Sequence, residues 1–484
     1  MAPGITIVGL GPGDPELITR QAWRVLAEAG EAYLRTERFP GTAGLPPGLR
    51  LHTFDHLYDE FESFEQVYDR MAEELIVLGQ RQAGVVFAVP GDPTVGEATV
   101  TRLRTAAEAG GLPLQLIAGI SFVEPSLALI GVDALDGLSV ADAAELAGRH
   151  HPTFPPEHHV LIGQLHSRLV ASDVKLTLLN QYAADHRVAL ITSAGTPQAA
   201  AEWLPLHELD QRSDFDVLTS LYLTPAAAGS SFESFQETVA HLRAPEGCPW
   251  DREQTHQSLR QHLLEEAYEA LEAIDQQDME ALQEELGDMM LQLVLQTQIA
   301  SESGDFQMSD VLRSINDKLI RRHPHVFGDA QVEEVDQVLH NWEALKAAER
   351  KAGGKKESAL DGVPSTLPAL ATALEIQSRA ARVGFDWPER AGVLDKIIEE
   401  IEEIERAEPG DVAAELGDLF FALVNYARWR QVDPESALRQ ANLRFRRRFG
   451  GVEARAGQAG RLMSEMPIEE LEALWQAAKR EETE

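Results

Sequence analysis

The chain has 484 residues, of which 44% are hydrophobic and 25% charged, a composition that excludes a fibrous or largely disordered protein. Its formal net charge of −37 disfavours non-specific binding to nucleic acid or to an anionic membrane. The length predicts about three domains, and a single cysteine, Cys248, is typical of a reducing compartment. The sequence begins without the features of a signal peptide and has no run apolar enough to cross a bilayer, so we expect a cytoplasmic protein.

Short apolar runs alternate with helical stretches before residue 230, with glycine and proline at their ends. The expected strands are Ile5–Leu10, Gly84–Val89, Leu114–Ile117, His159–Ile162, Arg187–Thr192 and Leu218–Leu223. Such alternation predicts an α/β domain with a largely parallel sheet, which we place at residues 1–228.

Glycine loops follow three of these strands, at Gly9–Asp14, Pro90–Pro93 and Ala118–Ser121. The first loop lacks the spacing of a dinucleotide-binding fingerprint, so a dinucleotide is a poor fit. Glycine turns at the carboxyl ends of strands can line a crevice for a flat ligand, or they can be ordinary strand-to-helix turns.

The segments GLGPGDPELIT and VPGDPTVGEAT resemble the tetrapyrrole (corrin/porphyrin) methylase family over residues 4–225. The resemblance implies two α/β subdomains with S-adenosylmethionine between them. The residues it places near this cofactor are Gly9, Gly11, Gly13, Asp14, Gly91, Asp92, Pro93 and Ser121. Ala118 and Phe122 depart from the residues usual in the family, so the methyl acceptor stays open.

After Ser231 the sequence changes to long helical stretches, interrupted by a linker at residues 351–364. Five blocks recur in the same order on the two sides of this linker. They are a tryptophan, the acidic motifs EExxE and ExxD, a basic block and a second tryptophan; Glu265 and Glu399, for example, are 134 residues apart. This repetition predicts a duplicated helical unit, with copies at 231–350 and 365–484.

The acids of each motif share a helix face. The carboxylates of EExxE fall within about 100° of one another around a helix, although a solvated acidic face would look the same. The helices that carry ExxD are apolar nearly all round, with no Lys or Arg on those stripes, so we expect their acids to be largely buried and in need of a partner. We favour Mg²⁺ over a buried salt-bridge network. Gly287 and Gly417 indicate that another group approaches these helices closely.

The basic blocks, Lys318 to Arg322 and Arg444 to Arg448, each lie on one helix face. Such a face is about equally typical of a site that binds a polyphosphate and of an ordinary solvated surface. Trp250 and Trp387 could stack a nucleobase or pack in the core.

Residues 246–350 and 360–480 resemble two copies of the MazG nucleoside triphosphate pyrophosphohydrolase domain, and the whole chain resembles YabN-type fusions of a methylase with MazG domains. The resemblance implies a dimeric all-α bundle that hydrolyses NTPs or dNTPs to the monophosphate and pyrophosphate with Mg²⁺. The metal ligands it implies are Glu265, Glu266, Glu269, Glu285, Asp288, Glu399, Glu400, Glu403, Glu415 and Asp418. We favour the second copy, Glu399 to Asp418, as the catalytic one. The substrate-binding residues it implies are Lys318, Arg321, Arg322, Trp387, Asn442, Arg444, Arg447 and Arg448.

Two other functions stay open at this point. The chain could be an S-adenosylmethionine-dependent methyltransferase whose helical half regulates it or forms a dimer. It could also be a nucleotide sensor whose metal sites bind without turnover.

Overall fold

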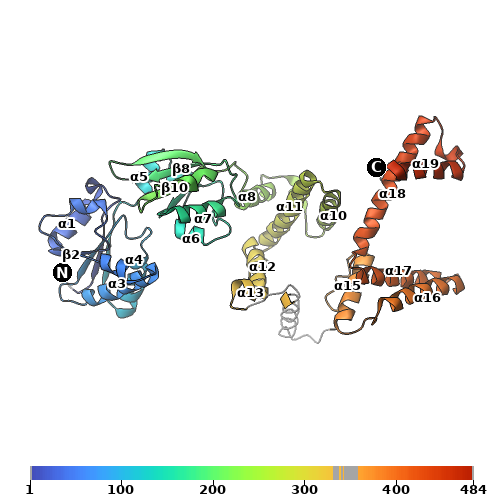
Figure 1. The fold of residues 1–484 in the computed structure, drawn as a ribbon, viewed down its shortest axis with the longest axis horizontal. Coiled ribbons are helices and arrows are strands. Elements are labelled where there is room, and N and C mark those ends of the chain that lie inside the picture. The colour runs from blue at the N-terminus through green and yellow to red at the C-terminus, as the bar shows by residue number, and fades with distance from the viewer. Residues whose placement is uncertain (1–2, 331–336, 339–341, 343–357, 482–484) are drawn as a thin grey trace. The chain divides into compact units, whose positions relative to one another are not determined.

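The computed structural model describes residues 3–330, 337–338, 342 and 358–481. They form two compact units, Met1–Glu253 and Gln254–Glu484. The first combines two β-sheets with helices and the second is helical in its described residues (Figure 1), which confirms the expected fold class. No helix in the described ranges has both the length and the apolar content that a membrane crossing requires. Of the predicted linker, residues 351–357 lie outside the described part.

The first sheet has five parallel strands in the order β3-β2-β4-β1-β5. Its elements are β1 (Ile5–Gly9), α1 (Arg20–Ala29), β2 (Glu31–Leu34), β3 (Arg50–Thr53), α2 (Asp55–Glu60), α3 (Phe64–Gly79), β4 (Val85–Val89), α4 (Ala98–Gly110), β5 (Leu114–Ile117) and α5 (Val123–Ile130). All of β4 is buried, because helices cover both faces of a parallel sheet. Such strands are mainly apolar in sequence, which is why β1, β4 and β5 were predicted.

The second sheet is mixed, so the prediction of a largely parallel sheet is wrong here. Its order is β6-β7-β10-β8-β9; only β6 and β7 pair in parallel. The short connection at residues 193–199 joins β8 directly to β9, and a connection of this length suits an antiparallel pair. The elements are β6 (Leu138–Asp142), α6 (Ala143–Ala147), β7 (His159–Gly163), α7 (Arg168–Leu178), β8 (Arg187–Thr192), β9 (Ala200–Pro205) and β10 (Thr219–Leu223).

Two helices follow the change in composition at Ser231 but group with the first unit. They are α8 (Phe232–Arg243) and α9 (Pro249–Glu253). The Ser231 hydroxyl caps α8 by accepting the backbone N–H of Ser234 at 3.0 Å, and it donates to Glu157 at 2.6 Å. This capping fixes the start of α8 where the sequence becomes helical.

The second unit contains two helix hairpins, α10 with α11 and α16 with α17, whose helices lie side by side (Figure 1). Asp278 caps α11 through the backbone N–H groups of Glu280 and Ala281. The helices of this unit are α10 (Arg260–Gln276), α11 (Met279–Ser303), α12 (Met308–Arg322), α13 (Pro324–Phe327), α15 (Ala369–Arg382), α16 (Arg390–Arg406), α17 (Val412–Trp429), α18 (Pro434–Gln458) and α19 (Ile468–Glu481).

Candidate functional site

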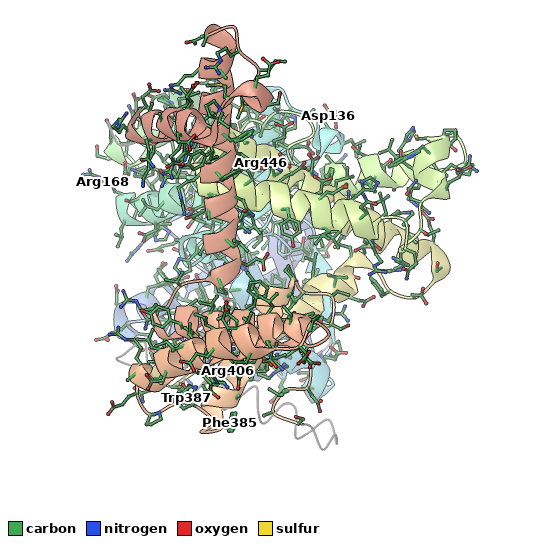
Figure 2. The ribbon with its side chains drawn as sticks, turned by 90° about the vertical axis from the view of Figure 1, so that its right-hand side faces the viewer. Asp136, Arg168, Phe385, Trp387, Arg406 and Arg446 are labelled. Carbon is green, nitrogen blue, oxygen red and sulfur yellow. The ribbon has the colours of Figure 1, made fainter. Side chains whose placement is uncertain are left out.

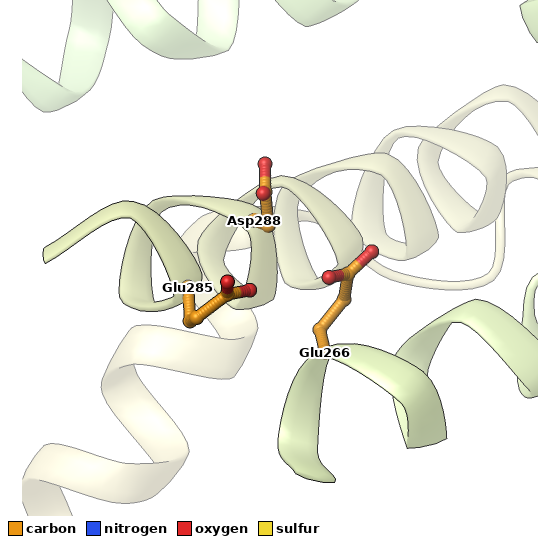
Figure 3. Close-up of side chains that lie close together, drawn as sticks. All are labelled: Glu266, Glu285 and Asp288. Atoms are coloured by element: carbon orange, nitrogen blue, oxygen red, sulfur yellow. The ribbon is translucent and has the colours of Figure 1, made fainter. Parts of the chain in front are cut away.

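The first hairpin brings together three carboxylates from its two helices. Glu266 on α10 faces Glu285 and Asp288 on α11 (Figure 3), and one oxygen of each lies within 4.8 Å of the others. Burial raises the pKa of Glu266, and the negative charges of Asp288 and Glu269 raise it further. Partial loss of surrounding water, with the charges of Glu269 and Asp288, likewise raises the pKa of Glu285. Mutual repulsion of this kind is what a bound cation would relieve.

The second hairpin repeats this arrangement with Glu400 and Glu403 on α16 and Glu415 on α17. Burial and the charge of Glu400 raise the pKa of Glu403. Glu400 is only 3% exposed, and its Oε1 forms an ion pair with the Nζ of Lys396 at 2.8 Å. Sequence reasoning missed this cation, although the i to i+4 spacing of Lys396 and Glu400 on one helix could have revealed it.

The remaining oxygen of Glu400 shows that the second cluster fits a metal. Its Oε2 is buried and has no hydrogen-bond partner among the described residues. A buried carboxylate oxygen without a partner is costly, and a hard divalent cation binds such oxygens well. Carboxylates on facing helices are also the type of oxygen donor that Mg²⁺ takes from proteins.

The other four predicted ligands lie outside these two groups. Glu265 is paired with His262 at 3.3 Å and Glu399 with Lys396 at 2.9 Å. Glu269 is exposed but close enough to raise the pKa of Glu266. Asp418 is exposed on α17. The roles of these four as ligands stay predictions.

The expectation that the ExxD acids are largely buried is wrong for the chain by itself. Neither Glu285 nor Glu415 is buried, and Asp418 is exposed. In the first hairpin α10 covers only one face of α11, so apolar side chains beside these acids stay exposed as well; on α11 these include Leu286 at 52% and Leu293 at 57%. The expected close approach to Gly287 and Gly417 is also absent within the described chain, since a Cβ at either would meet nothing within 4 Å.

The basic residues lie on helices other than those of the acid hairpins. The first block lies on α12 and the second, with Asn442, on α18. The two blocks share one contact: Arg322 lies over the ring of Trp342 and Arg448 over that of Trp475, each at 5.9 Å. This shared contact agrees with the repeat seen in the sequence. Trp387 is 43% exposed and follows α15, close to Phe385 (Figure 2). A joint site of these residues with the acids stays a prediction.

The three glycine loops of the first unit meet at the carboxyl edge of its parallel sheet. Gly11 and Gly91 exchange backbone hydrogen bonds of 3.2 and 2.7 Å. A Cβ on Gly119 would lie 2.1 Å from the Gly91 carbonyl oxygen, so only glycine fits this crossing. Asp92 holds the third loop by accepting from the Gly119 N–H at 2.9 Å. Ser121 is buried and donates to Glu124 at 2.6 Å.

A cavity of about 950 Å³ opens beside these loops. Of the residues expected near a cofactor, those that line it are Gly91, Asp92, Pro93 and Ser121, while Gly9, Gly11, Gly13 and Asp14 do not. The cavity also contains an ion pair between Arg35 and Glu97, with Nη1 and Oε1 3.0 Å apart. Sequence reasoning missed this pair because 62 positions separate two residues that belong to no common motif.

Comparison with known proteins follows the division into two units. Residues 4–210 match the profile of the tetrapyrrole (corrin/porphyrin) methylases, and residues 254–327 match that of the MazG nucleotide pyrophosphohydrolase domain. The YabN protein of Bacillus subtilis (strain 168) is 39% identical, over 100% of this chain and 99% of its own. The chain belongs to the YabN family.

Two further relatives of this YabN-family chain cover about half of it. The nucleoside triphosphate pyrophosphohydrolase/pyrophosphatase MazG of Thermotoga maritima is 47% identical over 253 residues, which are 52% of this chain and 97% of that protein. The nucleoside triphosphate pyrophosphohydrolase of Escherichia coli (strain K12) is 44% identical over 50% of this chain and 95% of its own length. Both expected domain types are therefore confirmed. Residues 254–327, which match the MazG domain profile, lie in the first of the two repeats.

Proposed function

We propose that the helical unit is a cytoplasmic, Mg²⁺-dependent nucleoside triphosphate pyrophosphohydrolase, which converts an NTP or dNTP and water to the monophosphate and pyrophosphate. The observation that carries the proposal is the acid cluster on α16 and α17, where the buried Oε2 of Glu400 lacks a partner. The names of the two relatives that match about half of the chain at 44% and 47% identity support the same reaction.

We assign a separate role in this reaction to each group of residues in and around the cluster. Glu400, Glu403 and Glu415 would hold the metal, and Lys396 fixes the position of Glu400. Bound Mg²⁺ would offset charge on the phosphates and favour attack by water on one phosphorus. Arg444, Arg447 and Arg448 would bind the phosphate oxygens, for which guanidinium groups are well suited.

An assay of released pyrophosphate tests this proposal. The full chain is incubated with MgCl₂ and each of the eight common NTPs and dNTPs, and each reaction is repeated with EDTA. We expect pyrophosphate from at least one nucleotide, and none with EDTA. Absence of pyrophosphate in all eight reactions would leave the nucleotide-sensor hypothesis as the better one.

We further propose that the helical unit forms a homodimer. Large apolar side chains are exposed on α11 and α17, among them Met290 and Phe420 at 46% and 57%. A second pair of helices would cover these faces, and it would also exclude water from the neighbouring acids.

The second candidate function is S-adenosylmethionine-dependent methylation by the first unit. The specific observation in its favour is the meeting of the three glycine loops beside a cavity large enough for a cofactor and a second small molecule. Calorimetry with S-adenosylmethionine tests it, and we expect Gly11→Val to abolish binding, because Gly11 has a φ of +78° and a Cβ there would lie 2.7 Å from the Leu17 carbonyl oxygen.

A further inference from the structure

The two acid clusters of the helical unit differ in the residue that stands three positions before their first glutamate. This position holds His262 on α10 and Lys396 on α16, which are 134 residues apart like the acids that follow them. The Nδ1 of His262 lies 3.3 Å from Glu265, and Glu266 has no ion pair among the residues that the structure describes. Both carboxylate oxygens of Glu266 therefore remain open to a metal.

In the second cluster the lysine occupies one oxygen of the buried glutamate. The Nζ of Lys396 lies 2.8 Å from Oε1 of Glu400 and 2.9 Å from Oε1 of Glu399. Its hydrogen bonds to these two carboxylates raise the pKa of Lys396, so the ammonium stays charged. The Glu400 side chain is 4% exposed, and its Oε2 has no hydrogen-bond partner within the described chain. Only Oε2 is thus left for a metal.

The number of oxygens that a carboxylate offers affects which divalent ion a site prefers. Mg²⁺ requires a near-ideal octahedron of six ligands and takes one or two carboxylates together with water. Ca²⁺ is larger, takes six to eight oxygens and often binds both oxygens of one carboxylate. An ion pair that occupies Oε1 of Glu400 removes this second option, so it disfavours Ca²⁺ more than Mg²⁺.

The charge of the ammonium has a separate effect. A positive charge beside the cluster repels either divalent ion, and the repulsion depends on charge and distance rather than on which ion it is. This effect changes both affinities by similar factors. The occupied oxygen changes their ratio, and the ratio therefore distinguishes the two effects.

We propose that Lys396 is a specificity-determining residue, which makes the second cluster bind Mg²⁺ in preference to Ca²⁺ by leaving Glu400 a single open oxygen. The inference rests on the proposed function of the helical unit, because it concerns the metal site of that reaction. It goes beyond the positioning of Glu400, since loss of the lysine should change which ion the cluster prefers.

Displacement of bound Mn²⁺ from the full chain tests this proposal without any turnover. The reference chain carries Glu285→Gln and Asp288→Asn, so that the first cluster does not contribute. Electron paramagnetic resonance of the free Mn²⁺, as MgCl₂ or CaCl₂ is added, gives the affinities of both ions. Lys396→Met removes the ammonium but keeps an unbranched apolar stem. We expect it to lower the ratio of Mg²⁺ to Ca²⁺ affinity by about tenfold.

Three further variants complete the experiment. Arg406→Met is the matched control, because it removes a cation of the same helix that pairs with Glu402, outside the cluster. Lys396→Arg keeps a positive charge that can pair with Glu400. Both should leave the ratio within about twofold of the reference chain. Lys396→His introduces the residue that the first copy has at this position, and at pH 8, where histidine is neutral, it should lower the ratio as Lys396→Met does.

An unchanged ratio in both Lys396→Met and Lys396→His would overturn the proposal, even if both affinities rise, because the lysine would then act through its charge alone. The pyrophosphate assay of the full chain separates this failure from that of the proposed function. Mg²⁺-dependent release of pyrophosphate together with an unchanged ratio would leave the hydrolase and refute the role of Lys396. Absence of Mn²⁺ binding to the reference chain would refute both the metal site and this inference.

Discussion

Lys396 and Glu400 form an ion pair of 2.8 Å along α16, while the other oxygen of the same carboxylate, Oε2, is buried without a hydrogen-bond partner in the described structure. One oxygen of this carboxylate is thus held by an ion pair, and the other has no hydrogen-bond partner in the described structure. The Lys396 ammonium fixes the orientation of Glu400 toward Glu403 and Glu415, where a metal would complete the set.

Replacing Glu400 should therefore abolish most of the pyrophosphohydrolase activity. We expect Glu400→Gln to lower kcat by about a hundredfold or more, because loss of a metal ligand removes several kcal/mol of charge stabilisation. The matched control is Glu402→Gln on the same helix, since Glu402 is exposed and pairs with Arg406 at 2.6 Å. Equal activity of the two variants in the pyrophosphate assay would refute the assignment of the metal site.

Substitutions in the two copies of the acid cluster should lower kcat by different amounts. Glu266 is the counterpart of Glu400, 134 residues earlier, and it is only partly buried. We expect Glu266→Gln to lower turnover less than Glu400→Gln, because a more exposed carboxylate binds a metal less tightly. Measurement of kcat for the two single variants and the double variant tests this order. A larger loss with Glu266→Gln would move the active site to the first copy.

The first unit should lose stability as the pH rises through the titration of Glu97. The pKa of this group is raised from 4.5 to about 7 on folding, so between these values the folded state binds more protons than the unfolded state. Stability linked to this group is therefore fully present below about pH 4.5 and is lost as the pH approaches 7. The total is at most about 3 kcal/mol.

Comparison with Glu97→Gln isolates this contribution, since glutamine does not titrate. The free energy of unfolding of the first unit is measured from the hydrogen exchange of the β1 and β4 amides in increasing concentrations of urea. The measurement is made at pH 5 and at pH 8. We expect the free energy of unfolding of the parent, minus that of the variant, to be larger at pH 5. A difference that does not change with pH would show that Glu97 titrates normally.

The crossing of the glycine loops should not tolerate a side chain. At Gly119 a Cβ would meet the Gly91 carbonyl oxygen at 2.1 Å. We therefore expect Gly119→Ala to lower the free energy of unfolding by about 1–3 kcal/mol. Gly110→Ala is the control, because a Cβ there meets nothing within 4 Å and helical Ala is favoured over Gly by about 1 kcal/mol. If thermal unfolding shows both variants to be equally stable, the loops do not cross so closely in solution.

The exposed apolar face of α11 should be needed for dimer formation. Leu293 is 57% exposed on this helix, whereas Leu169, 72% exposed, lies on α7 of the other unit. We expect Leu293→Glu to shift the protein toward the monomer in sedimentation velocity, because a charge in an apolar interface is costly. Leu169→Glu should leave the mass unchanged. A parent protein that is already monomeric would contradict the homodimer proposal.

Much of this protein could be predicted from local sequence patterns. The strands β1, β4 and β5 are short, mainly apolar runs, and the acidic motifs recur at a spacing that only a duplicated helical unit explains. Strand β3 could not be predicted in this way, since most of Arg50–Thr53 is exposed and carries polar groups. The strand directions of the second sheet also depend on which strands become neighbours, and local residue patterns do not specify this.

The sequence by itself determined the two architectural classes and which acids share one face of a helix, because helical and strand periods are set by local backbone geometry. Only the tertiary structure decided how exposed each acid is, and which groups from distant segments come together. Glu400 is buried whereas Asp418 is exposed, although both lie in the same repeat. Likewise Arg35 meets Glu97 only because β2 and β4 are neighbours in the sheet, which brings together the chain segments that follow them. Burial and long-range pairing depend on the packing of elements far apart in the chain, and no local pattern contains that information.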